Sequence, residues 1–534
     1  MTTDTSQDPG GAAAEPVRPA PSTAVHPGVF WPALTILVLS AALAMAFPDG
    51  TSKVLAEIQT AIVAGWGWYY VLVVAVFVAF SLWMGLSRFG RIRLGPDDEE
   101  PEYGLLAWFS MLFAAGMGIG LVFWGAAEPL TFLVNPKPGV SGPPSTLAEQ
   151  SMAQVFLHWG LHAWAIYVVV GLALAYSIHR KGNPVSIRWA LEPLLGERVR
   201  GRLGDAVDTV AVVGTVAGVA TSLGLGVQQI AAGLVHLGVF DTAGNGLMIP
   251  LIVVITLIAI ASVVSGIGKG IKWLSNINLI LAGVFLLAVL ALGPTLFILR
   301  DLVQNVGVYL GSVLPLTFST SAFQGDAGEA WQGSWTMFYW GWWMSWAPFV
   351  GVFIARISRG RTVRQFVAGV LLVPTLVTFA WFSVLGGTAM YRQLNGPGSL
   401  LEDDGSIISQ NVLFDVLQGL PLGGLLSVLA IVLVTIFFVT SSDSGSLVVD
   451  MLASGGNPDP PTWSRVLWAS VEGVVAAGLL LAGGLTALQT GAIITALPFS
   501  LVMLGMCVAT YRAFSMEHRL GDAGSRTKEQ VSSR

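Results

Sequence analysis

Long apolar segments alternate with short polar or Pro/Gly-rich stretches along most of the 534-residue chain. A helix needs about 20 mostly apolar residues to cross a lipid bilayer, so each long apolar segment is expected to be a transmembrane helix. The fifth and tenth segments are long enough to be tilted or broken. The twelve predicted spans are residues 29–47, 63–87, 104–124, 151–178, 206–236, 246–266, 273–294, 335–355, 366–389, 412–440, 464–484 and 489–511.

The distribution of Lys and Arg predicts the orientation of these spans. If both chain ends lie in the cytoplasm, the outer loops hold only four of the 26 basic residues: Lys53, Lys137, Arg300 and Arg392. Basic residues concentrate in the cytoplasmic loops of membrane proteins. We therefore expect a multi-pass protein of the plasma (cell) membrane, in contact with lipid, with both termini cytoplasmic.

Three segments outside the spans have their own character. Residues 1–28 are rich in Pro, Ala, Thr and Ser and lack the basic start of a signal peptide, which predicts a disordered cytoplasmic tail. Residues 513–534 form a second, short polar tail. Residues 295–332 mix apolar and polar positions with few charges, which predicts a helix in the outer membrane interface followed by a linker.

Composition supports a membrane protein and excludes other classes. Hydrophobic residues make up 54% of the chain and charged residues 11%, against roughly 25% charged in soluble proteins. A net charge of -5 provides no basic field for nucleic acid. The one cysteine, Cys507, forms neither an intramolecular disulfide nor a thiolate metal cluster, and we expect it to pack against its neighbours.

The motifs of soluble enzymes are missing from the sequence. It contains no Walker-type phosphate loop, no His-Glu-x-x-His zinc motif and no Gly-x-Ser-x-Gly elbow, so we expect neither enzymatic activity nor a cofactor. His158 and His162 are four residues apart on one predicted helix. Without a carboxylate or thiolate nearby they make a weak metal site, and packing is their expected role.

A run of glycines interrupts the predicted third span. Gly116, Gly118 and Gly120 alternate with larger residues in Ala114–Gly120. Glycine allows the helix to unwind and to present carbonyl oxygens to a cation or amide groups to a carboxylate. Helix packing explains the same residues, because Gly116 and Gly120 also form a Gly-x-x-x-Gly contact face.

Tryptophans are unusually dense near the eighth span, where six of the chain's 19 lie between residues 331 and 346. Trp342, Trp346 and Phe349 form one stripe of a helix, with Trp343 about 60° away. Gly341 and Pro348 predict a weakened helix at this depth.

The fourth span carries a matching aromatic face. Trp159, Trp164 and Tyr167 fall within an arc of about 140° on a helix. Rings that face a shared volume can bind a quaternary ammonium group. The cation–π interaction with each desolvated ring contributes about 2 kcal/mol. A bulky packed core or an interfacial aromatic belt explains the same residues.

Hydroxyl groups cluster at the predicted inner end of the tenth span, in Thr440–Gly445. Thr440 and Ser441 offer hard oxygen ligands for an alkali cation beside backbone oxygens of the third span. A helix C-terminus ended by Gly445 explains this motif without an ion. Thr221 and Ser222 in the fifth span are explained by hydrogen bonds between helices.

Several of these motifs together resemble the betaine/carnitine/choline transporter family. The segment SWTMFYWGWW at residues 334–343 is similar to the family signature, and the resemblance covers residues 30–510. It extends through AAGMGIGLVFWGAAEP at 114–129, HWGLHAW at 158–164, TSLGLGVQQI at 221–230 and FFVTSSDSG at 437–445.

The resemblance implies an all-α integral membrane protein with twelve transmembrane helices. Residues 29–98 would form two peripheral helices, and residues 103–294 and 333–512 two inverted five-helix repeats of the LeuT kind, joined by residues 295–332. The family is also commonly trimeric, which implies a homotrimer. Residues 513–534 lack the strongly basic character of the family's osmosensing tails, so direct osmotic gating by this segment is not expected.

The resemblance also implies the site residues. The substrate would be held by an aromatic box of Trp159, Trp164, Tyr167 and Trp343, by Trp342 and Trp346 along the path, and by Gly116, Gly118 and Gly120. One sodium ion would lie among Ala114, Met117, Thr440 and Ser441, and a second near Thr221, Ser222 and Phe349.

The expected function is therefore import of glycine betaine, or a related onium solute, by sodium symport with alternating access. Proton-coupled choline carriers of the family often have Asp at the position of Gly120, which favours a zwitterion here. A proton-coupled choline transporter and a carnitine-type exchanger remain alternatives within the family. A channel or a non-transporting membrane sensor is the alternative from another class.

Overall fold

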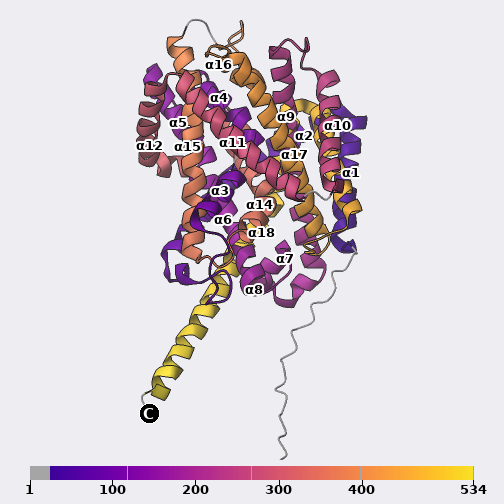
Figure 1. The fold of residues 1–534 in the computed structure, drawn as a ribbon, viewed down its shortest axis with the longest axis vertical. Coiled ribbons are helices and arrows are strands. Elements are labelled where there is room, and N and C mark those ends of the chain that lie inside the picture. Colours follow the sequence, from indigo (N-terminus) through magenta and orange to yellow (C-terminus); the bar gives the residue numbers. More distant parts are fainter. Residues whose placement is uncertain (1–24, 117, 266–267, 397–399, 533–534) are drawn as a thin grey trace, which may run out of the picture.

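The computed structural model describes residues 25–116, 118–265, 268–396 and 400–532 (Figure 1). These residues form helices and connecting loops without a β-strand; a single antiparallel bridge pairs Arg93 with Thr362. The all-helical prediction is confirmed for this part of the chain. The helices are α1 (Pro27–Ala46), α2 (Pro48–Leu86), α3 (Leu105–Gly116), α4 (Ile119–Val134), α5 (Pro144–Trp159), α6 (Leu161–Ala175), α7 (Ile187–Ala190), α8 (Glu192–Leu195), α9 (Arg202–His236), α10 (Asn245–Ser265), α11 (Gly268–Leu292), α12 (Thr295–Thr317), α13 (Gly325–Gln332), α14 (Phe338–Arg356), α15 (Val363–Asn395), α16 (Ser409–Gln418), α17 (Gly423–Ala453) and α18 (Thr462–Ser532), with short turns η1 (Arg88–Arg91), η2 (Tyr176–Arg180), η3 (Gly196–Arg200) and η4 (Gly333–Met337).

Nine helical segments of the described chain are long and apolar enough to cross a membrane. The protein is thus a multi-pass membrane protein, while the number of twelve spans stays a prediction. The predicted third span does not appear among the nine because the glycine run divides it into α3 and the 16-residue α4.

The break in the third span follows from its glycines. α3 ends at Gly116 and α4 begins at Ile119, with Gly118 between them in extended conformation at φ -164° and ψ -179°. Two other long segments also contain breaks. Gly160 separates α5 from α6, and α18 changes direction at Gly483 and Gly484, where Gly484 has φ +58°. Glycine alone adopts such a positive φ without steric cost.

The expectation of a weakened eighth span is wrong. α14 runs as one helix through Gly341 and Pro348, and lies in the middle of the helical body (Figure 1). It packs against α6, α9 and α18, so neighbouring helices hold it in place. Gly341 serves this packing, because a Cβ atom there would lie 2.9 Å from the Cα atom of Ile493.

The boundary predicted for the tenth span is also wrong. Residues 409–418 form the separate helix α16, and α17 continues past the hydroxyl motif to Ala453. Gly445 therefore lies inside α17 and does not cap it. A Cβ atom at Gly445 would lie 3.1 Å from the Val219 side chain, so the missing side chain allows α17 to approach α9 closely.

The predicted polar tail is helical. α18 continues through it to Ser532, and Figure 1 shows its last turns extending away from the helical body.

Candidate functional site

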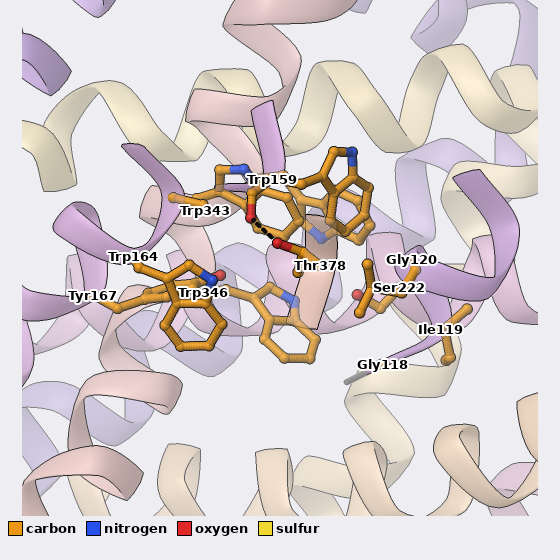
Figure 2. Close-up of a pocket in the computed structure, with 13 residues that line it drawn as sticks. Gly118, Ile119, Gly120, Trp159, Trp164, Tyr167, Ser222, Trp343, Trp346 and Thr378 are labelled. Atoms are coloured by element: carbon orange, nitrogen blue, oxygen red, sulfur yellow. Dashed lines mark hydrogen bonds between the residues drawn. The ribbon is translucent and has the colours of Figure 1, made fainter. Parts of the chain in front are cut away.

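Three helices, α5, α6 and α14, bring the predicted aromatic residues around one cavity (Figure 2). The start of α4 forms one wall, the α5–α6 junction a second, and α14 a third, while α9 and α15 add one hydroxyl each. The cavity measures about 50 Å³, several times the ~10–15 Å³ that one water molecule requires. Its lining is Gly118, Ile119, Gly120, Leu121, Trp159, Ala163, Trp164, Tyr167, Ser222, Trp342, Trp343, Trp346 and Thr378. None of these described lining residues is charged.

Five of the six rings that line this cavity form a continuous cluster, whereas Trp346 contacts Phe349. Trp342 and Trp343 stack with ring centroids 4.8 Å apart and an angle of 14°. Trp159 meets Trp343 edge to face at 4.9 Å, and Trp164 meets Tyr167 in the same way at 5.3 Å. All five side chains are buried. Aromatic packing at these distances gives each ring a fixed orientation.

The indole N–H groups of three cavity tryptophans are bound by the protein. Trp343 Nε1 donates to the carbonyl oxygen of His158 at 2.8 Å, and Trp342 Nε1 donates to that of Gly218 at 3.3 Å. Trp159 Nε1 donates to Glu128 Oε2 at 2.7 Å. Because these donors are already used, the three side chains offer only their π surfaces to a guest.

The glycine run lets the wall of α4 approach these rings. A Cβ atom on Gly120 would lie 2.4 Å from the Trp342 ring and 3.0 Å from the Trp159 ring. Gly118 has open space around the same position. Of the predicted glycines, Gly118 and Gly120 line the cavity, and Met117 lies outside the described residues.

A second cavity of about 160 Å³ contains several residues predicted to bind sodium. Ala114 of α3, Phe349 of α14, and Thr440 and Ser441 of α17 line it together with Ser275 and Asn278 of α11. Trp346 lines both cavities. The structure thus brings α3 and α17 to the same space, as the sequence predicted.

The two hydroxyls of α9 do not lie in that second cavity. Ser222 lines the aromatic cavity, whereas Thr221 lines neither. The Thr221 hydroxyl donates to the carbonyl oxygens of Ala217 at 2.8 Å and Leu488 at 3.0 Å, and so joins α9 to α18. Thr221 therefore makes the hydrogen bond between helices that was its alternative explanation.

Glu128 is the main residue that the sequence reasoning missed. It lies on α4, beyond the predicted end of the third span, and is fully buried. His158 Nδ1 lies 2.7 Å from Glu128 Oε1, so the assumption that no carboxylate stands near this histidine is wrong. An acidic residue between GLVFWGAA and PL was a usable signal, because ionisable groups at membrane depth are rare and functional.

The other contacts of the two histidines hold helices together. His162 Nε2 hydrogen-bonds Thr317 Oγ1 at 2.8 Å, and its ring stacks on Trp340. Among the described residues, no group of three or more His, Cys, Asp or Glu side chains could hold a metal ion. Thr378, also missed, donates to the carbonyl oxygen of Trp159 at 3.2 Å and so supports the α5–α6 junction.

Comparison with known proteins places this chain among transporters. Residues 28–519 match the family model "BCCT, betaine/carnitine/choline family transporter". An uncharacterized transporter of Mycobacterium tuberculosis is 52% identical over 92% of this chain and 83% of its own length. The glycine betaine transporter OpuD of Bacillus subtilis is 43% identical over 92% of this chain and 95% of its own length. Glycine betaine transporter 1 of Vibrio parahaemolyticus is 43% identical over 93% and 95%. The chain is a transporter, not an enzyme, and belongs to the betaine/carnitine/choline transporter family.

Proposed function

We propose that the protein imports glycine betaine, or a closely related onium solute, together with sodium by alternating access. The observation that carries this proposal is the uncharged cavity enclosed by five buried rings from α5, α6 and α14. A trimethylammonium group has no N–H to donate, and aromatic faces bind it by cation–π attraction. The names of the relatives from B. subtilis and V. parahaemolyticus support the same substrate class.

The start of α4 suits the other end of a zwitterion. Gly118, Ile119 and Gly120 line the cavity where α4 begins. The first N–H groups of a helix have no partner within it, and the helix dipole there attracts a negative charge. A bound zwitterion would then place its carboxylate at the N–H groups of α4 and its onium group among the aromatic rings. This arrangement favours glycine betaine over choline.

The second cavity supports sodium coupling. The Thr440 and Ser441 hydroxyls of α17 share this cavity with Ala114, beside the unwound segment between α3 and α4. Hydroxyl and backbone oxygens are suitable ligands for an alkali cation. Trp346 lies between this cavity and the aromatic one, so sodium bound in one cavity would affect substrate binding in the other.

The proposed architecture follows the family pattern. Residues 103–294 and 333–512 would be inverted repeats of the LeuT kind that move against each other. Both termini would be cytoplasmic in the plasma membrane. The outer face of α12 exposes Val303, Leu310 and Leu314, which supports a contact between copies in a homotrimer.

Uptake by the purified protein in liposomes tests this function. We expect saturable uptake of radiolabelled glycine betaine that requires an inward sodium gradient. Equal uptake without sodium under an imposed proton gradient would show proton coupling, and exchange that needs only internal substrate would show a carnitine-type exchanger. Flux that does not saturate and needs no gradient would show a channel.

A further inference from the structure

A buried carboxylate without a basic partner stands directly behind the aromatic cavity. Glu128 is 0% exposed and does not line the cavity itself. Its Oε2 atom accepts hydrogen bonds from Trp159 Nε1 at 2.7 Å and from the Tyr339 hydroxyl at 2.5 Å. Trp159 is a wall of the cavity, so one indole ring connects the guest space to this carboxylate.

The hydrogen bonds around His158 show which form of Glu128 the site fits. Gln154 Nε2, an amide donor, lies 2.9 Å from His158 Nε2, which must then accept. The other ring nitrogen, Nδ1, therefore carries the proton and donates to Glu128 Oε1 at 2.7 Å. Three N–H and O–H donors consequently point at the carboxyl group. Such a set satisfies the ionised carboxylate, whereas in a neutral acid the Tyr339 oxygen is the only one of these three partners that could accept the proton.

This charge has no fixed counterpart in the protein. Within the described residues, no Lys or Arg nitrogen lies within 4.0 Å of Glu128, and His158, the one basic side chain within that distance, is neutral. The nearby base Lys137 donates to Ser319 Oγ at 2.8 Å and lies over the Trp331 ring. Burial of an uncompensated carboxylate is costly. A permanently cationic guest on the other side of Trp159 would offset that cost.

We propose that Glu128 is the fixed counter-charge for the onium group and sets the preference of the cavity for positively charged methylated solutes. This inference rests on the proposed function. Glu128 acts in two ways, because its charge attracts the cation across the ring and its hydrogen bond orients Trp159. A carboxylate bound to the indole N–H also polarises the ring toward its π face, which strengthens cation–π attraction.

A pair of solutes of equal shape tests the charge alone. Glycine betaine and 3,3-dimethylbutanoate differ only in having N⁺ or carbon at the trimethylated centre. The experiment measures how strongly each unlabelled compound inhibits uptake of radiolabelled glycine betaine in liposomes. The quantity compared is the inhibition constant of 3,3-dimethylbutanoate divided by that of glycine betaine. In Glu128→Gln we expect this ratio to shrink about tenfold, equal to about 1.4 kcal/mol, because only the cationic guest loses an attraction. An equal loss for both compounds would show a merely structural residue and overturn the proposal.

Two further variants separate charge from geometry. Glu128→Asp keeps the charge but shortens the side chain, so both inhibition constants should rise while their ratio stays close to that of the wild type. A ratio that shrinks as far in Glu128→Asp as in Glu128→Gln would contradict a charge effect. Should Glu128→Gln fail to fold, retention of the ratio in Glu128→Asp would still support the proposal, and its loss would overturn it.

The control is Glu149→Gln on α5, a carboxylate that accepts a hydrogen bond from the Gln304 amide at the protein surface. In Glu149→Gln the ratio of the two inhibition constants should equal that of the wild type. The wild-type protein itself separates the two hypotheses. If it does not bind glycine betaine, the proposed function fails and the role of Glu128 fails with it. If it binds glycine betaine but Glu128→Gln leaves the ratio unchanged, only the role of Glu128 fails.

Discussion

Trp343 of α14 donates its indole N–H to the carbonyl oxygen of His158, 2.8 Å away in the last turn of α5. This bond joins the two aromatic walls of the cavity where the chain turns at Gly160. It fixes the Trp343 ring edge to face with Trp159 and stacked on Trp342. The position of the ring therefore depends on the backbone of the opposite wall.

Replacement of Trp343 by Leu should weaken substrate binding. The change removes one ring from the cavity, and a loss of about 1.4 kcal/mol corresponds to a tenfold increase in the half-saturating concentration. Initial rates of glycine betaine uptake in liposomes measure this value. Trp340→Leu is the matched control, because Trp340 is also buried on the same helix but packs on His162 and does not line the cavity. An unchanged half-saturating concentration in Trp343→Leu would remove this ring from the site.

Gly120→Ala should abolish high-affinity binding, whereas Gly118→Ala should leave it nearly intact. The new methyl group at Gly120 would lie 2.4 Å from the Trp342 ring, so the ring must move. At Gly118 the methyl group meets nothing within 4 Å, and the extended backbone there suits alanine. Binding of glycine betaine, followed by tryptophan fluorescence, compares the two variants. Similar losses in both would indicate that the glycines serve only to unwind the chain.

The sequence predicted the cavity better than it predicted the helices. The 3.6-residue period placed Trp342 and Trp346 on one face of α14, and both line the cavity because that helix is continuous. Periodicity also grouped Trp159 with Trp164, although Gly160 breaks the helix between them. Trp159 and Trp164 still face the same cavity because the break occurs within one turn, and the hydrogen bond from Thr378 to the Trp159 carbonyl oxygen stabilises the junction.

Features that depend on contacts between helices escaped prediction. Glu128 is adjacent to Tyr339 and His158 only because α4, α5 and α14 converge, and spacing along the chain contains no trace of this. The continuity of α14 through Pro348 likewise depends on the surrounding helices. Apolar patterns also cannot locate the end of α17, since Leu447, Val448 and Val449 extend the apolar run beyond the hydroxyl motif.

Removal of the hydroxyls at Thr440 and Ser441 should weaken sodium binding. The double variant Thr440→Ala/Ser441→Ala loses two of the proposed oxygen ligands, and we expect the half-saturating sodium concentration to rise at least about tenfold. Uptake at saturating glycine betaine over a series of sodium concentrations measures this value. Thr435→Ala is the control, because Thr435 also bonds the backbone of α17 but lies outside the cavity. If the sodium dependence of the double variant matches the control, the proposed ion site is wrong.

Lys137 should make the stability of the protein depend on pH. It lies in the loop between α4 and α5, where burial lowers the pKa of its ammonium group to about 8. An unfolded lysine has a pKa of about 10.4. Between these values the unfolded chain holds a proton that the folded protein has released, so folding stability rises with pH from about 8 to 10.4. Below pH 8 both states are protonated and the cost of burying the charge is constant.

Lys137→Met tests this dependence because methionine fills a similar space without a charge. From pH 7.5 to 9.5, the melting temperature of the solubilised wild type should rise relative to that of the variant, and Lys137→Met should be the more stable protein at pH 7.5. Lys53→Met, which removes an exposed lysine from the start of α2, corrects for the general effect of losing one positive charge. A constant difference between wild type and Lys137→Met across this range would mean that Lys137 keeps its proton in the fold. In that case its hydrogen bond to Ser319 and its contact with the Trp331 ring would outweigh the cost of burial.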